Sequence, residues 1–154
     1  MKQQKLSVLF AIFIIVIFYS IKIVESALIP DITNFFGERV SLSQPQSAKI
    51  GKLRLNVQLP ADYKLLIKAN SQIHLFTLDG KLSRKISLKG TSTVVPVNRE
   101  IRADKLYVEL ALYYCKKGKE GLCLIKKVLF DVPIQKSKNS EEFALDYQVP
   151  DVTK

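Results

Sequence analysis

Two long runs of alternating side chains, between Lys105 and Ile134, most constrain what this chain can fold into. They meet at Cys115 and Cys123, the only cysteines of the chain. Because strand side chains alternate between two faces, pairing the runs antiparallel with the cysteines opposed collects the apolar residues on one face, interrupted only by Lys126. A slip of one residue would mix the two faces. The sequence therefore predicts a β-hairpin in this one register.

The same register brings the two cysteines within bonding distance. Directly opposed residues of an antiparallel pair have Cα atoms roughly 4.5 to 5.5 Å apart, and a disulfide needs roughly 4.4 to 6.8 Å. The loop from Lys116 to Leu122 contains two glycines and three lysines, as is typical of a solvated hairpin end. We therefore predict a disulfide between Cys115 and Cys123.

The amino terminus has the pattern of a targeting segment. Two lysines precede an uncharged stretch at residues 6–21, and small or branched residues lead up to position 27. Residues 1–26 are expected to be a signal peptide cleaved after Ser26, or a signal anchor formed by residues 6–24. The uncharged part of the anchor would be short, because the sixteen residues 6–21 span about 24 Å as a helix, against a core of about 30 Å. Ile23 and Val24 would extend it around Lys22. Both forms predict a periplasmic or secreted protein, with membrane contact only through an uncleaved leader.

Export also sets the redox state and the charge of the mature chain. A cysteine pair outside the cytosol is usually oxidised. Cleavage removes three lysines and one glutamate from 24 basic and 14 acidic groups, which leaves a net charge of +8. The remaining chain of about 125 residues suits one domain with a sizeable core.

The pattern after the leader predicts an arm and one all-β domain. Residues 27–49 are poorly patterned, and they form either an extended arm whose aromatic residues dock on the domain or a disordered tether. Residues 50–150 show about seven strand segments, few helix signals and no βαβ rhythm. These segments are 50–59, 72–78, 81–89, 91–97, 105–115, 123–134 and 143–149. We predict an immunoglobulin-like antiparallel β-sandwich.

Two of these strands carry the marks of a sheet edge. Lys81, Lys85 and Lys89 share one face of their strand, which favours a protected edge over the alternative of an anion-binding face. Pro96 cannot donate to a strand ladder, so its strand is expected at an edge or a bulge.

The sequence lacks the residues that most kinds of catalytic, metal or nucleotide site need. His74 is the only histidine, so a metal site would need more ligands, and a hydrolase would need a nucleophile partner for it. The glycines form neither a phosphate-binding loop nor a dinucleotide motif. We expect no metal, cofactor or nucleic-acid partner, and no hydrolase, kinase or dehydrogenase activity. His74 is expected to be a surface or packed residue.

The cysteine pair allows two interpretations. As a staple of the hairpin end it would contribute about 2 to 3 kcal/mol. As a redox-active pair it would use the reducibility of a strained bridge between adjacent strands. Lys116 and Lys117 would favour a thiolate, while Tyr113 and Glu109 on the cysteine face would supply a hydroxyl and a carboxylate.

Residues 53–134 resemble two known families. The carrying motifs are Val-Gln-Leu-Pro-Ala-Asp-Tyr-Lys-Leu at 57–65, Ala-Asn-Ser at 69–71, Leu-Tyr-Tyr-Cys at 112–115 and Gly-Leu-Cys at 121–123. They are similar to the carboxy-terminal β-domain of NHL-repeat proteins that also carry a thioredoxin-like domain. More distantly, they resemble the amino-terminal periplasmic domain of the thiol-disulfide interchange protein DsbD. The second resemblance implies an immunoglobulin-like fold whose cysteine pair, here Cys115 and Cys123, passes electrons from a thioredoxin-like donor to periplasmic oxidoreductases.

The leading hypothesis is an exported β-sandwich that acts as a binding or accessory module with a hairpin disulfide. The alternative is a thiol-disulfide oxidoreductase that works through Cys115 and Cys123 on a thioredoxin-fold partner. A third hypothesis, from the net charge of +8, is a basic adhesin-like module for anionic surface polymers, whose binding would weaken as salt screens the charges.

Overall fold

A computed structural model describes residues 30–66, 69–118, 122–136 and 141–151. The predicted leader at residues 1–26 lies outside this part of the chain. The chain divides into two compact units, Met1–Pro30 and Asp31–Lys154, and the described strands belong to the second. Within the described ranges, no helix has the length and apolar character needed to cross a bilayer.

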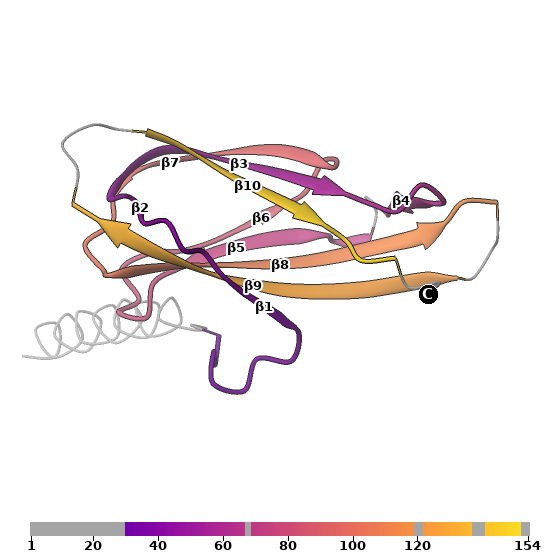
Figure 1. The fold of residues 1–154 in the computed structure, drawn as a ribbon, viewed down its shortest axis with the longest axis horizontal. Helices are drawn as coiled ribbons and strands as arrows, with labels where there is room; N and C mark the ends of the chain where they lie inside the picture. Colours follow the sequence, from indigo (N-terminus) through magenta and orange to yellow (C-terminus); the bar gives the residue numbers. More distant parts are fainter. Residues whose placement is uncertain (1–29, 67–68, 119–121, 137–140, 152–154) are drawn as a thin grey trace, which may run out of the picture. The chain divides into compact units, whose positions relative to one another are not determined.

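In the described ranges, ten strands build two sheets that pack face to face (Figure 1). The larger sheet has the order β1-β9-β8-β5-β6, with β2 also on β9 and β4 also on β8, and the smaller sheet has the order β10-β3-β7. The strands are β1 (Glu38–Ser41), β2 (Gln46–Ser47), β3 (Lys49–Gln58), β4 (Tyr63–Leu65), β5 (Gln72–Phe76), β6 (Ser83–Ser87), β7 (Ser92–Glu100), β8 (Lys105–Lys116), β9 (Cys123–Gln135) and β10 (Glu141–Gln148). The predicted all-β sandwich is confirmed. Each of the seven expected segments forms a strand, and β1, β2 and β4 are short additions.

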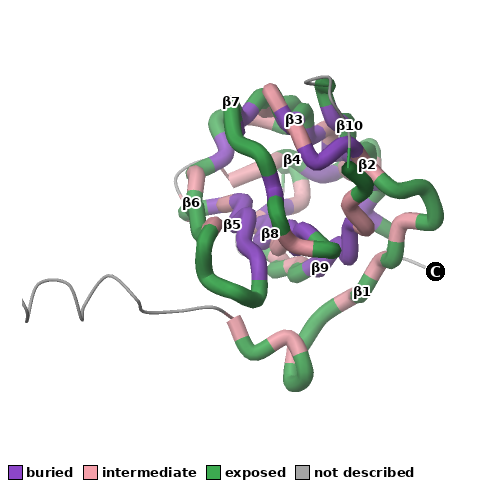
Figure 2. Tube along the Cα trace, turned by 90° about the vertical axis from the view of Figure 1, so that its left-hand side faces the viewer, coloured by how far each residue is buried: buried purple, intermediate pink, exposed green. Residues whose placement is uncertain are grey.

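The hairpin of β8 and β9 has the predicted register. Cys115 lies opposite Cys123, and the pairing continues without a shift to Lys105 opposite Pro133. One face of this hairpin is buried against the smaller sheet, as the end-on view in Figure 2 shows. Leucines and valines of β8 and β9 therefore form the centre of the core together with the inward side chains of β3, β7 and β10.

The sheets are mixed rather than purely antiparallel. β10 runs parallel to β3, with Leu145 beside Leu55, and β1 runs parallel to β9, with Val40 beside Phe130. The short connection from β9 to β10 explains the first pairing. β9 ends at the end of the sandwich where β3 begins, so β10 must start there as well and run in the same direction as β3 (Figure 1).

The described part of the arm, residues 30–49, adds to the larger sheet. β1 and β2 pair with β9, and Arg39 donates to the Asp131 carboxylate at 2.8 Å. Ile32 and Phe35 pack on a second apolar cluster on the outer face of the sheet, which consists of Phe76, Tyr107 and Leu129. The neighbouring Phe36 is 93% exposed. One of the two arm aromatics therefore docks.

Both edge predictions are confirmed. β6, which carries part of the lysine stripe, is the last strand of the larger sheet, and β7 is the last strand of the smaller one. The ladder between β7 and β3 shifts register between Ile50 and Lys52, and Pro96 pairs with Lys52 beside that shift. Pro96 therefore lies on an edge strand and next to an irregularity, where its missing N–H costs no ladder bond.

Lys126 interrupts the core face of the hairpin, and two distant residues compensate for it. Its ammonium lies 2.7 Å from the Glu38 carboxylate, which also accepts a hydrogen bond from the Tyr147 hydroxyl at 2.8 Å. The Lys126 hydrogen bond lowers the pKa of Glu38. Burial, together with the bond to Glu38, raises the pKa of the Tyr147 hydroxyl. The cluster joins β1, β9 and β10 across the seam between the sheets.

Candidate functional site

The disulfide closes the free end of the β8–β9 hairpin. The two Cα atoms are 4.0 Å apart. The next pair outward is hydrogen-bonded, because the N–H of Lys116 donates to the carbonyl of Leu122 at 3.0 Å. The cysteines therefore occupy a non-hydrogen-bonded pair, the position at which opposed Cα atoms come closest. The predicted Cys115–Cys123 disulfide is confirmed.

The two halves of the disulfide differ in exposure. Cys115 is 7% exposed, whereas Cys123 is an exposed residue. The strand neighbours explain the difference. β4 covers the free side of β8, with Lys64 opposite Cys115, but β1 covers β9 only from Val128 onward. The Cys123 side of the bond is therefore the side open to solvent.

Two exposed apolar residues lie close to Cys123 in the chain. Ile125 is 62% exposed and shares the face of the cysteines, whereas Leu122 is 44% exposed and, as the partner of Lys116, belongs to the other face. Tyr113 lies opposite Ile125 on the same face as the cysteines and is half-buried. Of the four supporting residues predicted from the sequence, Tyr113 is the one that the structure places beside the pair on their face of the sheet.

The lysines after Cys115 do not face the disulfide. Lys116 belongs to β8 and pairs with Tyr63, so strand alternation turns its side chain to the face opposite Cys115. Lys117 is held by the preceding loop, because its ammonium donates to the Ala61 carbonyl at 2.8 Å and its N–H donates to the Asp62 carbonyl at 2.7 Å. The prediction that these two charges would stabilise a thiolate therefore has no support from their placement.

Glu109 also lies away from the cysteines. Six residues of strand separate it from Cys115, which corresponds to about 20 Å. Its carboxylate lies 3.8 Å from Nδ1 of His74. The imidazole lowers the pKa of Glu109, and Lys127 and Lys85 act in the same direction. Glu109 therefore belongs to a different part of the sheet, and the prediction that it would serve the cysteine pair is not met.

His74 is a packed residue, as one of the two sequence interpretations expected. It is 1% exposed, Nε2 lies 2.9 Å from the Ser83 hydroxyl, and the ring packs on Phe76 with centroids 4.9 Å apart. Its Nδ1 has no hydrogen-bond partner in the described ranges. No group of three or more potential metal ligands occurs in that part of the chain.

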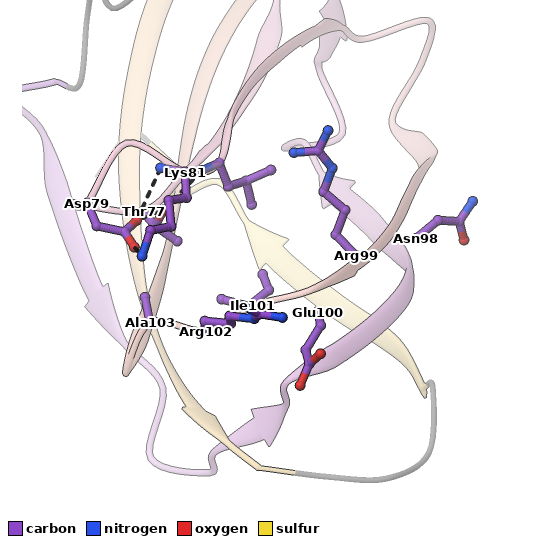
Figure 3. Close-up of a pocket in the computed structure, with 10 residues that line it drawn as sticks. Thr77, Asp79, Lys81, Asn98, Arg99, Glu100, Ile101, Arg102 and Ala103 are labelled. Atoms are coloured by element: carbon purple, nitrogen blue, oxygen red, sulfur yellow. Dashed lines mark hydrogen bonds and ion pairs between the residues drawn. The ribbon is translucent and has the colours of Figure 1, made fainter.

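A second candidate site lies at the opposite end of the sandwich, which faces the viewer in Figure 2. The turn between β5 and β6 and the segment from the end of β7 to the start of β8 enclose a recess of about 470 Å³. Figure 3 shows Thr77, Asp79 and Lys81 on one side of it and Arg99, Ile101 and Arg102 on the other. A neighbouring hollow of about 500 Å³ shares residues 100–103. We call the first hollow the loop-end recess.

The sequence pattern did not identify this recess. In the sequence, residues 98–104 read only as a charged loop between the predicted strands 91–97 and 105–115. In the structure, the N–H of Ile101 donates to the Ala48 carbonyl at 2.7 Å, and the N–H of Ile134 donates to the Asp104 carbonyl at 2.9 Å. Asn98 has a φ of 46°, a left-handed conformation that asparagine tolerates better than most residues. The sequence signal that could have indicated the recess is Asn98, which follows the strand containing Pro96 and precedes Arg99 and Arg102.

No protein-family model and no curated protein matches the chain. The two ends of the sandwich are therefore the features from which a function can be inferred.

Proposed function

We propose that this chain is an exported β-sandwich that acts as a binding module, with Cys115–Cys123 as the staple of its long hairpin. The loop-end recess is the observation that carries this proposal. Its volume of about 470 Å³ lies in the range of about 300 to 1,000 Å³ that ligand pockets occupy. Rigid β-sandwiches commonly present their binding residues on the loops at one end.

The placement of the other polar residues supports binding over catalysis. His74 is packed, Glu109 is paired with it, and the lysines near the cysteines face elsewhere. Export is supported by the targeting pattern of residues 1–26 and by the oxidised cysteine pair, since disulfides persist mainly in oxidising compartments.

A ligand screen by thermal unfolding tests the proposal. The full-length protein is heated with neutral saccharides, sulfated or phosphorylated compounds and peptides in turn. A ligand that binds only the folded state raises the Tm as its concentration rises. The expected result is a ligand whose effect is lost in an Arg99→Asp variant, which changes an exposed side chain of the recess wall, and kept in Ile125→Asp at the other end. Hits that respond only to Ile125→Asp would contradict a binding role for the recess.

Thiol-disulfide exchange is a second candidate function, favoured by the exposure of Cys123. A thiolate of a reduced dithiol partner would attack Sγ of Cys123, breaking the S–S bond and releasing Cys115 as a thiolate. The partner's second thiolate would then attack the mixed disulfide. The partner leaves as an intramolecular disulfide, and the Cys115–Cys123 pair has gained two electrons and become two thiols. The resemblance of the hairpin to the DsbD-type domain implies a thioredoxin-fold partner for this step.

Two measurements separate exchange from a staple. A reduction potential below about −300 mV marks a structural bond, and a value near about −200 mV marks an exchangeable one. The exchange candidate further expects Cys115→Ala to trap, on exposed Cys123, a thioredoxin-fold partner whose second cysteine has been removed, and Cys123→Ala to trap none on buried Cys115. Equal trapping by the two variants, or trapping by neither, would remove this candidate.

A further inference from the structure

We propose that the loop-end recess is an oxyanion site, in which Arg99 and Arg102 bind a phosphate or sulfate group. This inference rests on the proposed binding function and names the chemical class of its ligand. It follows from three features of the recess: arginines without partners, carboxylates that do not neutralise them, and a backbone that is already fixed.

The arginines of the chain differ in whether they are paired. Arg39 binds Asp131, Arg54 binds Glu142 at 2.7 Å, and Arg84 donates to the Pro96 carbonyl. Arg99 and Arg102 have no hydrogen-bond or ion-pair partner for their side chains within residues 30–66, 69–118, 122–136 and 141–151. Both line the same recess. The unpaired guanidinium groups are therefore concentrated at one place.

The carboxylates at the recess leave this positive charge in place. Asp79 accepts hydrogen bonds from the Thr77 hydroxyl at 2.6 Å and the Lys81 N–H at 3.2 Å, and it forms an ion pair with the Lys81 ammonium. Its charge is therefore already compensated locally. Glu100 projects away from Arg99 in Figure 3, as expected for adjacent residues of β7.

The backbone that carries the two arginines is held on both sides. Arg99 lies opposite Ile50 in the ladder of β7 and β3. Ile101, between the arginines, is buried and its N–H is bonded to Ala48. A fixed backbone lowers the ordering cost of binding. Guanidinium groups present a planar fork of donors that matches phosphate-type oxyanions, so the arrangement favours such a group over a neutral ligand.

The test is an amide chemical-shift titration of the full-length protein at constant ionic strength. Inorganic phosphate and inorganic sulfate represent free ions, and glycerol phosphate represents an ester group. Saturable shifts confined to residues 77–82 and 98–103 are expected. Tighter binding of glycerol phosphate than of the free ions would identify an ester-bearing ligand, and the reverse order would identify the free ion.

Substitutions show whether the two arginines make the site. Arg99→Ala and Arg102→Ala are each expected to weaken binding at least about tenfold, the effect typical of losing a hydrogen bond to a charged group. Arg99→Lys keeps the charge and is expected to weaken binding less. Arg54→Ala is the matched control, because it removes the same charge from the outer face of the smaller sheet. An unchanged unfolding midpoint in each variant confirms that the fold is intact.

Three results would overturn the inference. Shifts spread over the lysine-rich surface without saturation would indicate non-specific charge attraction, and so would equal weakening by Arg54→Ala and Arg99→Ala. If a neutral saccharide saturates the recess while phosphate and sulfate do not, the proposed binding function stands, but the ligand is not an oxyanion. If the saccharides and peptides of the thermal-unfolding screen also fail to shift the amides of the recess, the proposed binding function fails as well.

Discussion

Lys126 is a charged residue in the otherwise apolar core face of the hairpin, and the fold accommodates it. It lies on the core face of the hairpin, where an unpaired ammonium would carry a large desolvation cost. Glu38 and Tyr147 supply the missing partners, and both come from strands far away in the sequence. The charge is therefore tolerated only when β1 and β10 are in place.

Glu38→Ala is expected to destabilise the protein by about 1 to 2 kcal/mol, because it leaves a half-buried ammonium and the Tyr147 hydroxyl without their acceptor. Glu142→Ala is the matched control, since it also removes a carboxylate from a 2.7 Å pair, but one that is more exposed. That variant should change stability by less than about 0.5 kcal/mol. Urea unfolding measures both, and equal losses would count against a special role for the seam cluster.

The pair of Glu109 and His74 predicts acid sensitivity. The pKa of Glu109 is lowered in the folded state from its ordinary value of 4.5. A group with a lowered folded pKa contributes stability that is complete above its unfolded pKa and is lost as the pH falls through its folded pKa. The Glu109→Gln variant should therefore lose less stability than the wild type between pH 5 and about pH 3. Parallel urea midpoints for the two proteins across this range would refute the prediction.

Among the elements of the fold, the arm at residues 30–49 can dock only because its backbone at Gly37 passes very close to β9. A Cβ added at Gly37 would lie 2.7 Å from the Lys127 carbonyl and 2.7 Å from the ring of Phe35. Glycine therefore allows the chain to run against β9 just before β1 begins. The docking of Ile32 and Phe35 and the ion pair of Arg39 follow from that approach.

Two adjacent phenylalanines provide a test of the arm. Phe35→Ala should weaken arm docking by about 1 to 2 kcal/mol, because it removes a partly buried ring from the cluster of Phe76, Tyr107 and Leu129. Phe36→Ala removes the same atoms from solvent and should have almost no effect. Hydrogen exchange of the β1 amides reports on the docking. Similar protection in both variants would mean that Phe35 does not anchor the arm.

The hairpin staple can be tested by removing both cysteines. The disulfide has a sequence separation of 8, and a loop of this size corresponds to about 2 to 3 kcal/mol in the chain-entropy model. The Cys115→Ala/Cys123→Ala double variant should lose that amount in urea unfolding and keep the strand pairing, because the ladder continues to Lys105. Loss of the β8–β9 amide contacts in its NMR spectrum would show that the bond determines the register.

At the scale of the whole molecule, the sequence predicts what is local and misses what is distant. The register of Cys115 and Cys123 follows from alternation within thirty adjacent residues. The pairing of Lys126 with Glu38 cannot be predicted in this way, because alternation does not specify which strands become neighbours. The same reason hides the loop-end recess, since Ile101 is held by Ala48 from another part of the chain. Tyr113 could be placed beside the disulfide because it is two residues from Cys115 on the same face of the strand. Glu109 shares that face, but six residues separate it from Cys115.

The parallel pairing of β3 with β10 also sets the order in which the molecule can be assembled. It joins residues such as Asn56 and Asp146, which are 90 positions apart, whereas the cysteine hairpin closes over a few residues. Non-local strand pairing is slow, with folding times of roughly milliseconds to seconds. The hairpin is expected to form early and the smaller sheet to close last, when β10 arrives. Until then the apolar face of the hairpin lacks part of its cover from the smaller sheet, so the nearly complete molecule exposes a surface that favours aggregation.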